Sequence, residues 1–444
     1  MATADSGLAD SGVDDPVLRD AAREARRLLA PVRGELIELL QTLVRIDSTA
    51  VPPRGREAEA QRALNCILRA ARLETRLYDT GFLSRCDHPA VRHEREYRGR
   101  PNLVARLPGR GAGRSLLLSG HIDTVPPGPG RWRRDPFSGT ISRGRLHCRG
   151  AFDMKGGLAA QFGVLLALQR AKVRLAGDLI AESVVDEEWA GGGGTLAARL
   201  QGITAQACVI GEGTGLSVVR ATRGGLFVEV LAQAGDPAAY FSKDEVISPA
   251  VPMGRLLGWV DEWTCRRRQV DRGEAYRGFA DPAPVQVLAL EANRLDPETP
   301  WSVPLEARLR LYFQFLPHED QDAEMRAIED SFRSFCADDP FFSVHPPAWR
   351  RIVDPPLYGH ELPADHPWTR CLAGAAAAVL RRPVPVSAAE YPCDAALIQR
   401  GFGIPVLLFG PSGSGAHNLD EQVVLASVVR TAECLLTAAL CWCG

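Results

Sequence analysis

The strongest constraint on the fold is a pattern in which short apolar runs lead to histidine or acidic side chains. Buried strands that deliver ligand-type side chains to their carboxyl ends are typical of open α/β sheets. The sequence therefore predicts an α/β fold with a mostly parallel sheet and a functional site at one edge. The side chains in question, after apolar runs that end near residues 118, 185, 210 and 409, are His121, Glu188, Glu212 and His417.

The order of predicted elements divides the chain into a catalytic domain and an insertion. Strands and helices alternate over residues 16–221 and again over 353–444, whereas residues 222–352 follow the order strand, helix, two strands, helix. The middle pattern predicts a smaller α+β unit of ferredoxin-like type with an antiparallel sheet. At 444 residues the chain exceeds a typical single core, which fits a discontinuous catalytic domain with an inserted one. Residues 1–15 are expected to be disordered.

Apolar spacing predicts one long amphipathic helix from Pro16 to about Ile46. The other predicted helices and strands follow from the same analysis of periodicity. The helices are 57–72, 158–170, 247–266 and 319–335, and the strands are 102–107, 115–118, 178–185, 208–210, 226–231, 285–292, 305–315 and 405–409.

Composition narrows the class of protein. A net charge of -2 gives no electrostatic reason to expect nucleic acid as a partner. No apolar run approaches the length of a membrane span, and the N-terminus lacks the basic start and apolar core of a secretory signal, so no membrane partner is expected. The eleven cysteines are irregularly spaced without a C-x-x-C pair, which predicts free thiols and a cytoplasmic protein.

The histidines and acids of these motifs are suitable ligands for two divalent ions. Asp153 lies in a loop before a predicted helix, and its two oxygens can bridge two cations, although a helix N-cap is the simpler explanation. His121, Glu188, Glu212 and His417 complete a set of two histidines and three carboxylates. That set is the right count for two ions that share one ligand, with zinc as the expected metal and cobalt or manganese as alternatives.

Further residues beside these ligands support the chemistry. Asp123 can accept the second N–H of His121 and fix its tautomer. Of the adjacent Glu187 and Glu188, one can ligate metal while the other acts as general base. Glycines 156–157 would let the backbone pass close to the site. Lys155, in contrast, is expected to be a solvated residue at the start of a helix.

The motifs SGHIDTVP, GAFDMKGG, VVDEE followed by glycines, GEGT and AHNLDE occur in this order. With them the chain resembles the family of zinc aminoacylases, acetylornithine deacetylases and succinyl-diaminopimelate desuccinylases, which includes glutamate-releasing carboxypeptidases. The resemblance covers nearly everything from about residue 20 onward. It implies a metal-dependent hydrolase of amide bonds, with an inserted domain that serves as lid and dimer interface.

The resemblance also implies individual roles for the motif residues. They comprise a first metal site (His121, Glu212), a second metal site (Glu188, His417), a bridging ligand (Asp153), a residue that orients His121 (Asp123) and the general base (Glu187).

The chain departs from the family pattern in the inserted domain. The family places a histidine there that helps hold the oxyanion, but no histidine occurs between positions 147 and 318. Asp236 and Tyr240 lie nearest to the expected position, and of these the tyrosine can donate a hydrogen bond. The family arginine that grips a substrate carboxylate falls here on Tyr312 or Gln314.

Two interpretations follow. In the first, the enzyme hydrolyses an N-acyl amide or peptide-like small molecule that lacks the usual α-carboxylate. In the second, the fold is non-hydrolytic, catalysing acyl transfer or amide formation, or binds metal without activity. Retention of all five ligands and the base favours catalysis. The candidates for substrate contact are Trp189, Tyr240, Tyr312, Cys393 and Asp394.

Overall fold

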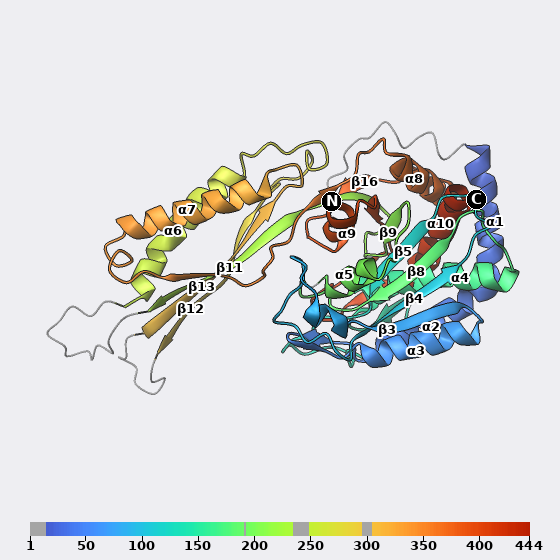
Figure 1. The fold of residues 1–444 in the computed structure, drawn as a ribbon, viewed down its shortest axis with the longest axis horizontal. Helices are drawn as coiled ribbons and strands as arrows, with labels where there is room; N and C mark the ends of the chain where they lie inside the picture. Colours follow the sequence, from blue (N-terminus) through green and yellow to red (C-terminus); the bar gives the residue numbers. More distant parts are fainter. Residues whose placement is uncertain (1–14, 191, 234–247, 295–303) are drawn as a thin grey trace.

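The computed structural model describes residues 15–190, 192–233, 248–294 and 304–444. The chain forms two parts that lie end to end along its longest axis (Figure 1). The larger part contains a nine-stranded sheet and the smaller part a four-stranded sheet. The predictions for residues 1–14, Asp236 and Tyr240 fall outside the described residues.

The nine-stranded sheet positions the site. Its strand order is β15–β10–β17–β9–β5–β8–β4–β3, with β16 beside β10. Strands β17, β9, β5 and β8 are parallel to one another, whereas β10, β15, β4 and β3 form antiparallel pairs. The α/β class is confirmed, but the sheet is mixed, and the expected parallel arrangement is confined to its centre and β16. The strand bounds are β3 Glu74–Asp79, β4 Pro101–Leu107, β5 Leu116–His121, β8 Leu179–Val184, β9 Cys208–Ile210, β10 Val218–Thr222, β15 His360–Glu361, β16 Val386–Ala388 and β17 Val406–Leu408.

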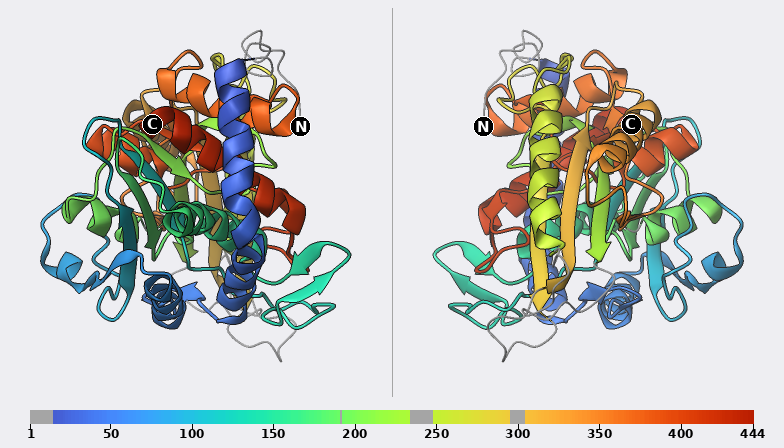
Figure 2. Two further views of the ribbon diagram at one scale, coloured as in Figure 1. Left: turned by 90° about the vertical axis from the view of Figure 1, so that its right-hand side faces the viewer. Right: turned by 90° about the vertical axis from the view of Figure 1, so that its left-hand side faces the viewer.

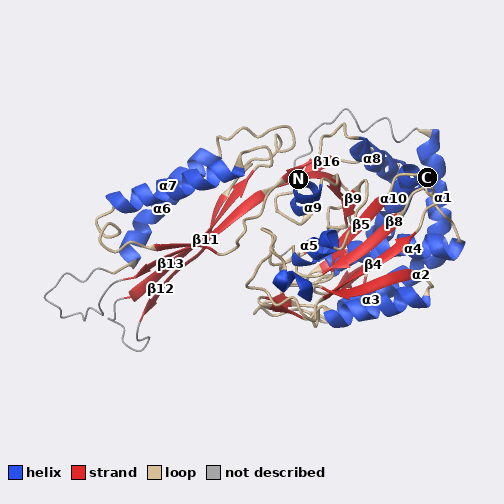
Figure 3. Cartoon of the chain, viewed as in Figure 1, coloured by secondary structure: helices blue, strands red, loops and turns tan. Residues whose placement is uncertain are grey.

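Helices cover both faces of this sheet, and Figure 3 shows blue helices on both sides of the red strands. Along β5, Leu116 and Leu118 join a core shared with α1, α2, α3, α4, α8 and α10, while Leu117 faces the core beneath α5 and α9. A strand buried on both faces needs apolar residues without alternation, which explains the continuous leucine run. The helix bounds are α1 Pro16–Leu29, α2 Arg33–Arg45, α3 Ala58–Ala70, α4 Gly156–Ala171, α5 Gly193–Leu200, α8 Pro367–Leu380, α9 Ala395–Phe402 and α10 Leu425–Cys443.

The long helix predicted from Pro16 to Ile46 is wrong. The segment divides into α1 and α2 at a 3₁₀ turn, Ala30–Val32, whose central residue is Pro31. Proline lacks the N–H that would continue the helical hydrogen bonds and clashes with the preceding turn. Figure 2 shows α1 running along one end of the molecule.

Two helical segments, Ala151–Ala171 and Leu425–Cys443, are long and apolar enough to span a membrane by length and composition alone. Neither segment is an uninterrupted apolar run, because Arg170 lies in the first and Arg430 and Glu433 lie in the second. Within the fold, 89% and 67% of their most apolar windows are buried. This burial is the property of core helices, which need apolar residues all round.

The smaller part follows the order β11, α6, β12, β13, α7, β14 and forms an antiparallel sheet in the order β12–β13–β11–β14. Both helices lie on the same face of this sheet (Figure 1) and share a separate apolar core with it. The predicted α+β unit is thus present, and the bounds 16–221, 222–352 and 353–444 remain our proposal for the domains. The elements are β11 Gly224–Gln233, α6 Ala250–Arg267, β12 Val285–Arg294, β13 Pro304–Phe315, α7 Gln321–Asp338 and β14 Ala348–Arg351.

A small four-stranded sheet in the order β18–β19–β7–β6 joins two segments that are far apart in the sequence. It pairs the strand before Asp153 with the strand after His417, because β7 and β19 are neighbours. The remaining elements are β1 Ala50–Val51, β2 Arg54–Gly55, β6 Thr140–Ser142, β7 Arg145–His147, β18 Gly413–Ser414, β19 Gln422–Val424, the 3₁₀ turn Gly81–Arg85 and the irregular turn Ala151–Lys155.

Candidate metal centre and active site

Five side chains predicted as metal ligands converge from five separate segments of the larger part. His121 ends β5, and Asp153 lies in the irregular turn that precedes α4. Glu188 and Glu212 follow β8 and β9, and His417 lies in the loop between β18 and β19. The sheet therefore gathers the motifs at one place, as their positions after apolar strands suggested.

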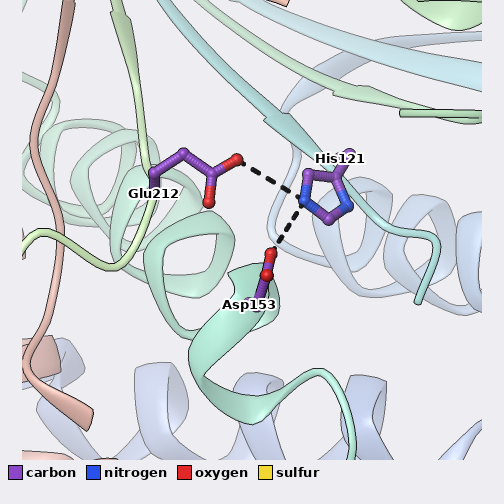
Figure 4. A group of neighbouring side chains, drawn as sticks. All are labelled: His121, Asp153 and Glu212. Atoms are coloured by element: carbon purple, nitrogen blue, oxygen red, sulfur yellow. Dashed lines mark hydrogen bonds and ion pairs between the residues drawn. The ribbon is translucent and has the colours of Figure 1, made fainter. Parts of the chain in front are cut away.

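Asp153 divides the five side chains into two groups of three that share it. One of its oxygens, Oδ1, lies 3.2 Å from Nε2 of His121, and the other, Oδ2, lies 3.2 Å from Nε2 of His417. Nε2 of His121 also lies 3.5 Å from Oε1 of Glu212, and Nε2 of His417 lies 2.7 Å from Oε2 of Glu188. Figure 4 shows the first group, with the ring of His121 facing both carboxylates. Within each group the candidate ligand atoms lie within 4.8 Å of one another.

A left-handed turn after β8 carries the paired glutamates into the site. Asp186 has a φ of 64°, which is uncommon for a residue with a side chain and often marks a functional position. Beyond it, Oε2 of Glu187 lies 3.9 Å from Nε2 of His121. The N–H of Glu188 donates to Oδ2 of Asp123 at 3.0 Å. The turn therefore presents Glu187 to the first group and Glu188 to the second.

Close backbone packing sets the distance between the Asp153 turn and the loop that carries Glu212. A Cβ placed on Gly157, in the first turn of α4, would lie 1.6 Å from the carbonyl oxygen of Gly211. Only glycine fits at such a contact, because any side chain would push the two ligand segments apart. The prediction that a glycine allows close approach at this position is confirmed.

Asp123 lies against the imidazole of His121, as expected of a residue that orients the ring. Nδ1 of His121 lies 3.0 Å from the backbone carbonyl oxygen of Asp123 and 3.6 Å from its carboxylate. The carbonyl, rather than the predicted carboxylate, is thus the nearer acceptor for the second N–H. This acceptor favours the tautomer in which Nδ1 carries the proton, and Nε2 is then unprotonated and available as a metal ligand.

The site concentrates more negative charge than its histidines can balance. Burial and neighbouring carboxylates raise the pKa of Glu188 to about 7, and they also raise the pKa of Glu187 and Glu212. Hydrogen bonds to Asp153 and Glu188 raise the pKa of His417 to about 11. Two divalent cations carry four positive charges and would balance the carboxylates of Asp153, Glu187, Glu188 and Glu212. The donor set and its electrostatics therefore fit a pair of divalent metal ions.

A buried ionic cluster behind the Asp186 turn was missed by the sequence analysis. Arg100 donates from Nη2 to Oδ1 of Asp186 at 3.0 Å and binds Glu57 through Nε at 3.2 Å and through Nη2. All three residues are at least 97% buried. Burial raises the pKa of Glu57 to about 7 even though Arg100 opposes this shift. The cluster ties the turn that carries Glu187 to the body of the domain.

Lys155 also differs from expectation, because it is fully buried instead of solvated. Its ammonium donates to the carbonyls of Leu43 at 3.0 Å and Ile46 at 3.2 Å, at the end of α2. Helix ends leave carbonyls without intrahelical partners, and a lysine can satisfy them. The residue therefore anchors the Asp153 turn to α2.

Three of the substrate-contact candidates lie close to the metal cluster. Trp189 follows Glu188 directly, is 39% exposed and donates from Nε1 to the carbonyl of Ala50 at 2.6 Å. Burial raises the pKa of Cys393 and that of Asp394, the latter to about 7, and the charges of site residues contribute to both shifts. Asp394 also accepts a hydrogen bond from Thr195.

Tyr312 is not brought together with these residues. It lies in β13 of the smaller sheet, is 93% buried and stacks on Phe227 with ring centroids 4.0 Å apart. Tyr391, which the sequence analysis did not single out, belongs to the active-site surroundings instead. Burial of its phenol and the charges of Glu212 and Asp153 raise its pKa, while the residue as a whole remains 40% exposed. Its position two residues before Cys393 was the available signal.

The sequence pattern of peptidase family M20/M25/M40 matches residues 117–440, which include every candidate ligand. The chain belongs to this family. It is accordingly a hydrolase of the metallopeptidase and amidohydrolase type, as the sequence motifs predicted.

Relatives of this M20-family chain include the N-formyl-4-amino-5-aminomethyl-2-methylpyrimidine deformylase of Halalkalibacterium halodurans, 28% identical over 93% of this chain and 95% of the relative. The succinyl-diaminopimelate desuccinylase of Methylobacterium sp. is 29% identical over 74% of this chain and 81% of the relative. Among solved structures, the M20 family metallo-carboxypeptidase Sso-CP2 from Sulfolobus solfataricus has a TM-score of 0.72 at 16% identity, covering 92% and 99% of the two chains. The Bacillus subtilis YXEP protein, a dinuclear metal-binding M20 peptidase, has a TM-score of 0.60 at 15% identity, covering 93% and 99%.

Proposed function

We propose that this M20 enzyme uses two divalent ions, with zinc as the first choice and cobalt or manganese as alternatives, to hydrolyse an N-acyl amide whose amine portion carries no carboxylate. The observation that carries the proposal is the placement of Asp153, whose two oxygens face two different histidines at 3.2 Å each. A carboxylate in that position suits a ligand shared by two ions. His121 and Glu212 would complete one site, and Glu188 and His417 the other.

In the proposed mechanism Glu187 moves the protons. Bound divalent ions would supply Lewis acidity that polarises the amide carbonyl and lowers the pKa of the attacking water. Glu187 takes a proton from that water and returns it to the nitrogen of the leaving amine. Burial and the charges of Asp394, Glu212 and Glu188 raise the pKa of Glu187, although His121 opposes this. A raised pKa makes the carboxylate a stronger base, which helps it to accept a proton and then return it.

The charges around the site support a substrate without a carboxylate. Four cationic side chains close to the ligands are already engaged by protein groups. Arg100 binds two buried acids, Arg149 binds Glu421, Lys155 binds backbone carbonyls, and Arg95 donates to the carbonyl of Trp189. None of these four is free to hold a substrate carboxylate. The name of the Halalkalibacterium relative describes such a substrate, a formamide of an aminomethylpyrimidine.

The test is a matched panel of amides offered to the purified protein. Formamides and acetamides of arylmethylamines are compared with the N-formyl and N-succinyl derivatives of amino acids. The proposal expects amine release from the carboxylate-free members, loss of release on chelation, and loss in Glu187→Gln. Preference for the amino-acid derivatives would refute the proposed specificity. Product formed only with an added amine acceptor would indicate acyl transfer, and no turnover at all would favour a metal-binding role.

A homodimer through the smaller part and a cytoplasmic location remain proposals. Support for the dimer is the edge strand β12, on which Val287, Leu288 and Leu290 are 47%, 50% and 49% exposed. Apolar side chains on an exposed edge strand favour pairing with another chain. Support for the location is that all eleven cysteines, each within the described residues, are free thiols. Light scattering of the wild type and of Leu290→Lys tests the dimer, which the substitution should dissociate.

A further inference from the structure

Glu421 ends the AHNLDE motif, but the proposed mechanism assigns it no role. Its side chain is fully buried. Each of its carboxylate oxygens accepts two hydrogen bonds from the segment that carries Asp153. Oε1 accepts from the backbone N–H groups of Phe152 at 2.8 Å and Asp153 at 3.0 Å, and Oε2 accepts from Gly150 N–H at 2.8 Å and Arg149 Nη1 at 2.6 Å.

Further hydrogen bonds of Arg149 and of the Glu421 backbone reach the turn that carries His417. Nη2 of Arg149 donates to the carbonyl of Asn418 at 3.0 Å, and the carbonyl of Glu421 accepts from Cys148 N–H at 3.0 Å. His417 itself is held weakly by packing, since 53% of its side chain is exposed and its φ is 58°. Its position therefore depends on the backbone turn between His417 and Glu421.

We propose that Glu421 is a positioning residue that joins the Asp153 turn to the His417 turn, so that both candidate metal sites are assembled as one unit. A buried carboxylate that satisfies three backbone donors of one turn and one arginine fixes the direction in which Asp153 presents its two oxygens. Arg149 carries the same restraint to the backbone beside His417. The inference rests on the proposed metal pair but concerns residues outside the ligand set.

The experiment measures metal binding rather than turnover. Glu421→Gln has almost the same shape, but whichever way its amide is oriented, its NH₂ group faces two of the four donors. The apo protein is titrated with cobalt, and bound metal is counted by elemental analysis while the visible spectrum of the bound cobalt is recorded. We expect cobalt affinity to fall about 10- to 100-fold, with fewer than two ions per chain where the wild type holds two.

A matched control separates positioning from general destabilisation. Glu433 is also a buried acid, 1% exposed, paired with Arg33 at 2.7 Å and Arg430 at 2.5 Å, but it lies on α10 away from the ligands. Glu433→Gln should lower the thermal midpoint while leaving two cobalt ions bound with the wild-type spectrum. If Glu421→Gln does not fold, Arg149→Met tests the positioning role instead, because three backbone donors still hold Glu421 in that variant. Cobalt binding should then weaken at one of the two sites.

Two cobalt ions bound to folded Glu421→Gln or Arg149→Met with wild-type affinity and spectrum would overturn the positioning role. Absence of cobalt binding by the wild type would instead refute the proposed metal pair, so the two failures are distinguishable.

Discussion

The same change from glutamate to glutamine, made at each of two adjacent positions, tests two different roles. Glu187→Gln and Glu188→Gln each remove one negative charge and preserve the size of the side chain, one residue apart on the same turn. Glu187 is proposed as the base, with its Oε2 3.9 Å from Nε2 of His121. Glu188 is proposed as a ligand, with its Oε2 2.7 Å from Nε2 of His417.

The first substitution should lower the rate of hydrolysis, whereas the second should lower the metal content. Loss of a general base lowers kcat by about 10²- to 10⁴-fold, equal to roughly 3–5 kcal/mol of activation free energy. Because Glu187 is not among the grouped ligand atoms, Glu187→Gln should keep two metal ions per chain. Glu188→Gln should lose one ion, because it removes one of three ligands in the group of Asp153 and His417. Both variants should unfold at higher temperature than the wild type when metal-free, since each relieves repulsion among buried carboxylates.

The assay combines initial rates on the preferred amide, elemental analysis and thermal unfolding of the apo proteins. The reasoning would be refuted by Glu187→Gln that retains turnover within tenfold of the wild type, or by equal metal loss in both variants.

Three further predictions concern residues outside the ligand set. Arg100→Met should lower the free energy of unfolding by about 3–5 kcal/mol in urea, because it leaves Glu57 and Asp186 buried without their cation. Burial lowers the pKa of His360 to about 4, so the stability due to neutral His360 is present above pH 6.5 and is lost as the pH falls toward about 4. Over that interval the free energy of unfolding of the wild type should fall by roughly 3 kcal/mol more than that of His360→Gln. Tyr391→Phe should lower kcat by about 10²-fold with little change in KM, because its phenol can donate to the developing oxyanion; an unchanged kcat excludes that role.

Much of the site could be predicted because its chemistry is local in the sequence. His121, Glu188 and Glu212 end or closely follow a buried strand, and strands of an open sheet deliver their ends to one edge. Asp153 and His417 lie in loops that their ligand-type side chains and neighbouring glycines made recognisable. The α/β class and the antiparallel insertion followed from hydrophobic periodicity in the same way. The antiparallel edges of the large sheet did not, because the direction in which a strand joins a sheet depends on long-range pairing.

Other features depend on contacts between distant segments and left no local signal. Glu57, Arg100 and Asp186 lie in three different segments, and only Asp186 belongs to a motif, yet they form one buried cluster. Lys155 was expected in solvent because lysine usually is, and the carbonyls at the end of α2 that it binds become visible only in three dimensions. Tyr312 was a candidate by alignment of motifs alone, whereas packing against Phe227 buries it.

The most direct test of the central claim is the metal content of the purified wild-type protein, measured by elemental analysis before and after chelation and after readdition of metal. The account predicts two divalent ions per chain, hydrolysis of a carboxylate-free amide that disappears with chelation, and recovery with zinc, cobalt or manganese. Full hydrolytic activity in protein that contains no metal would contradict it.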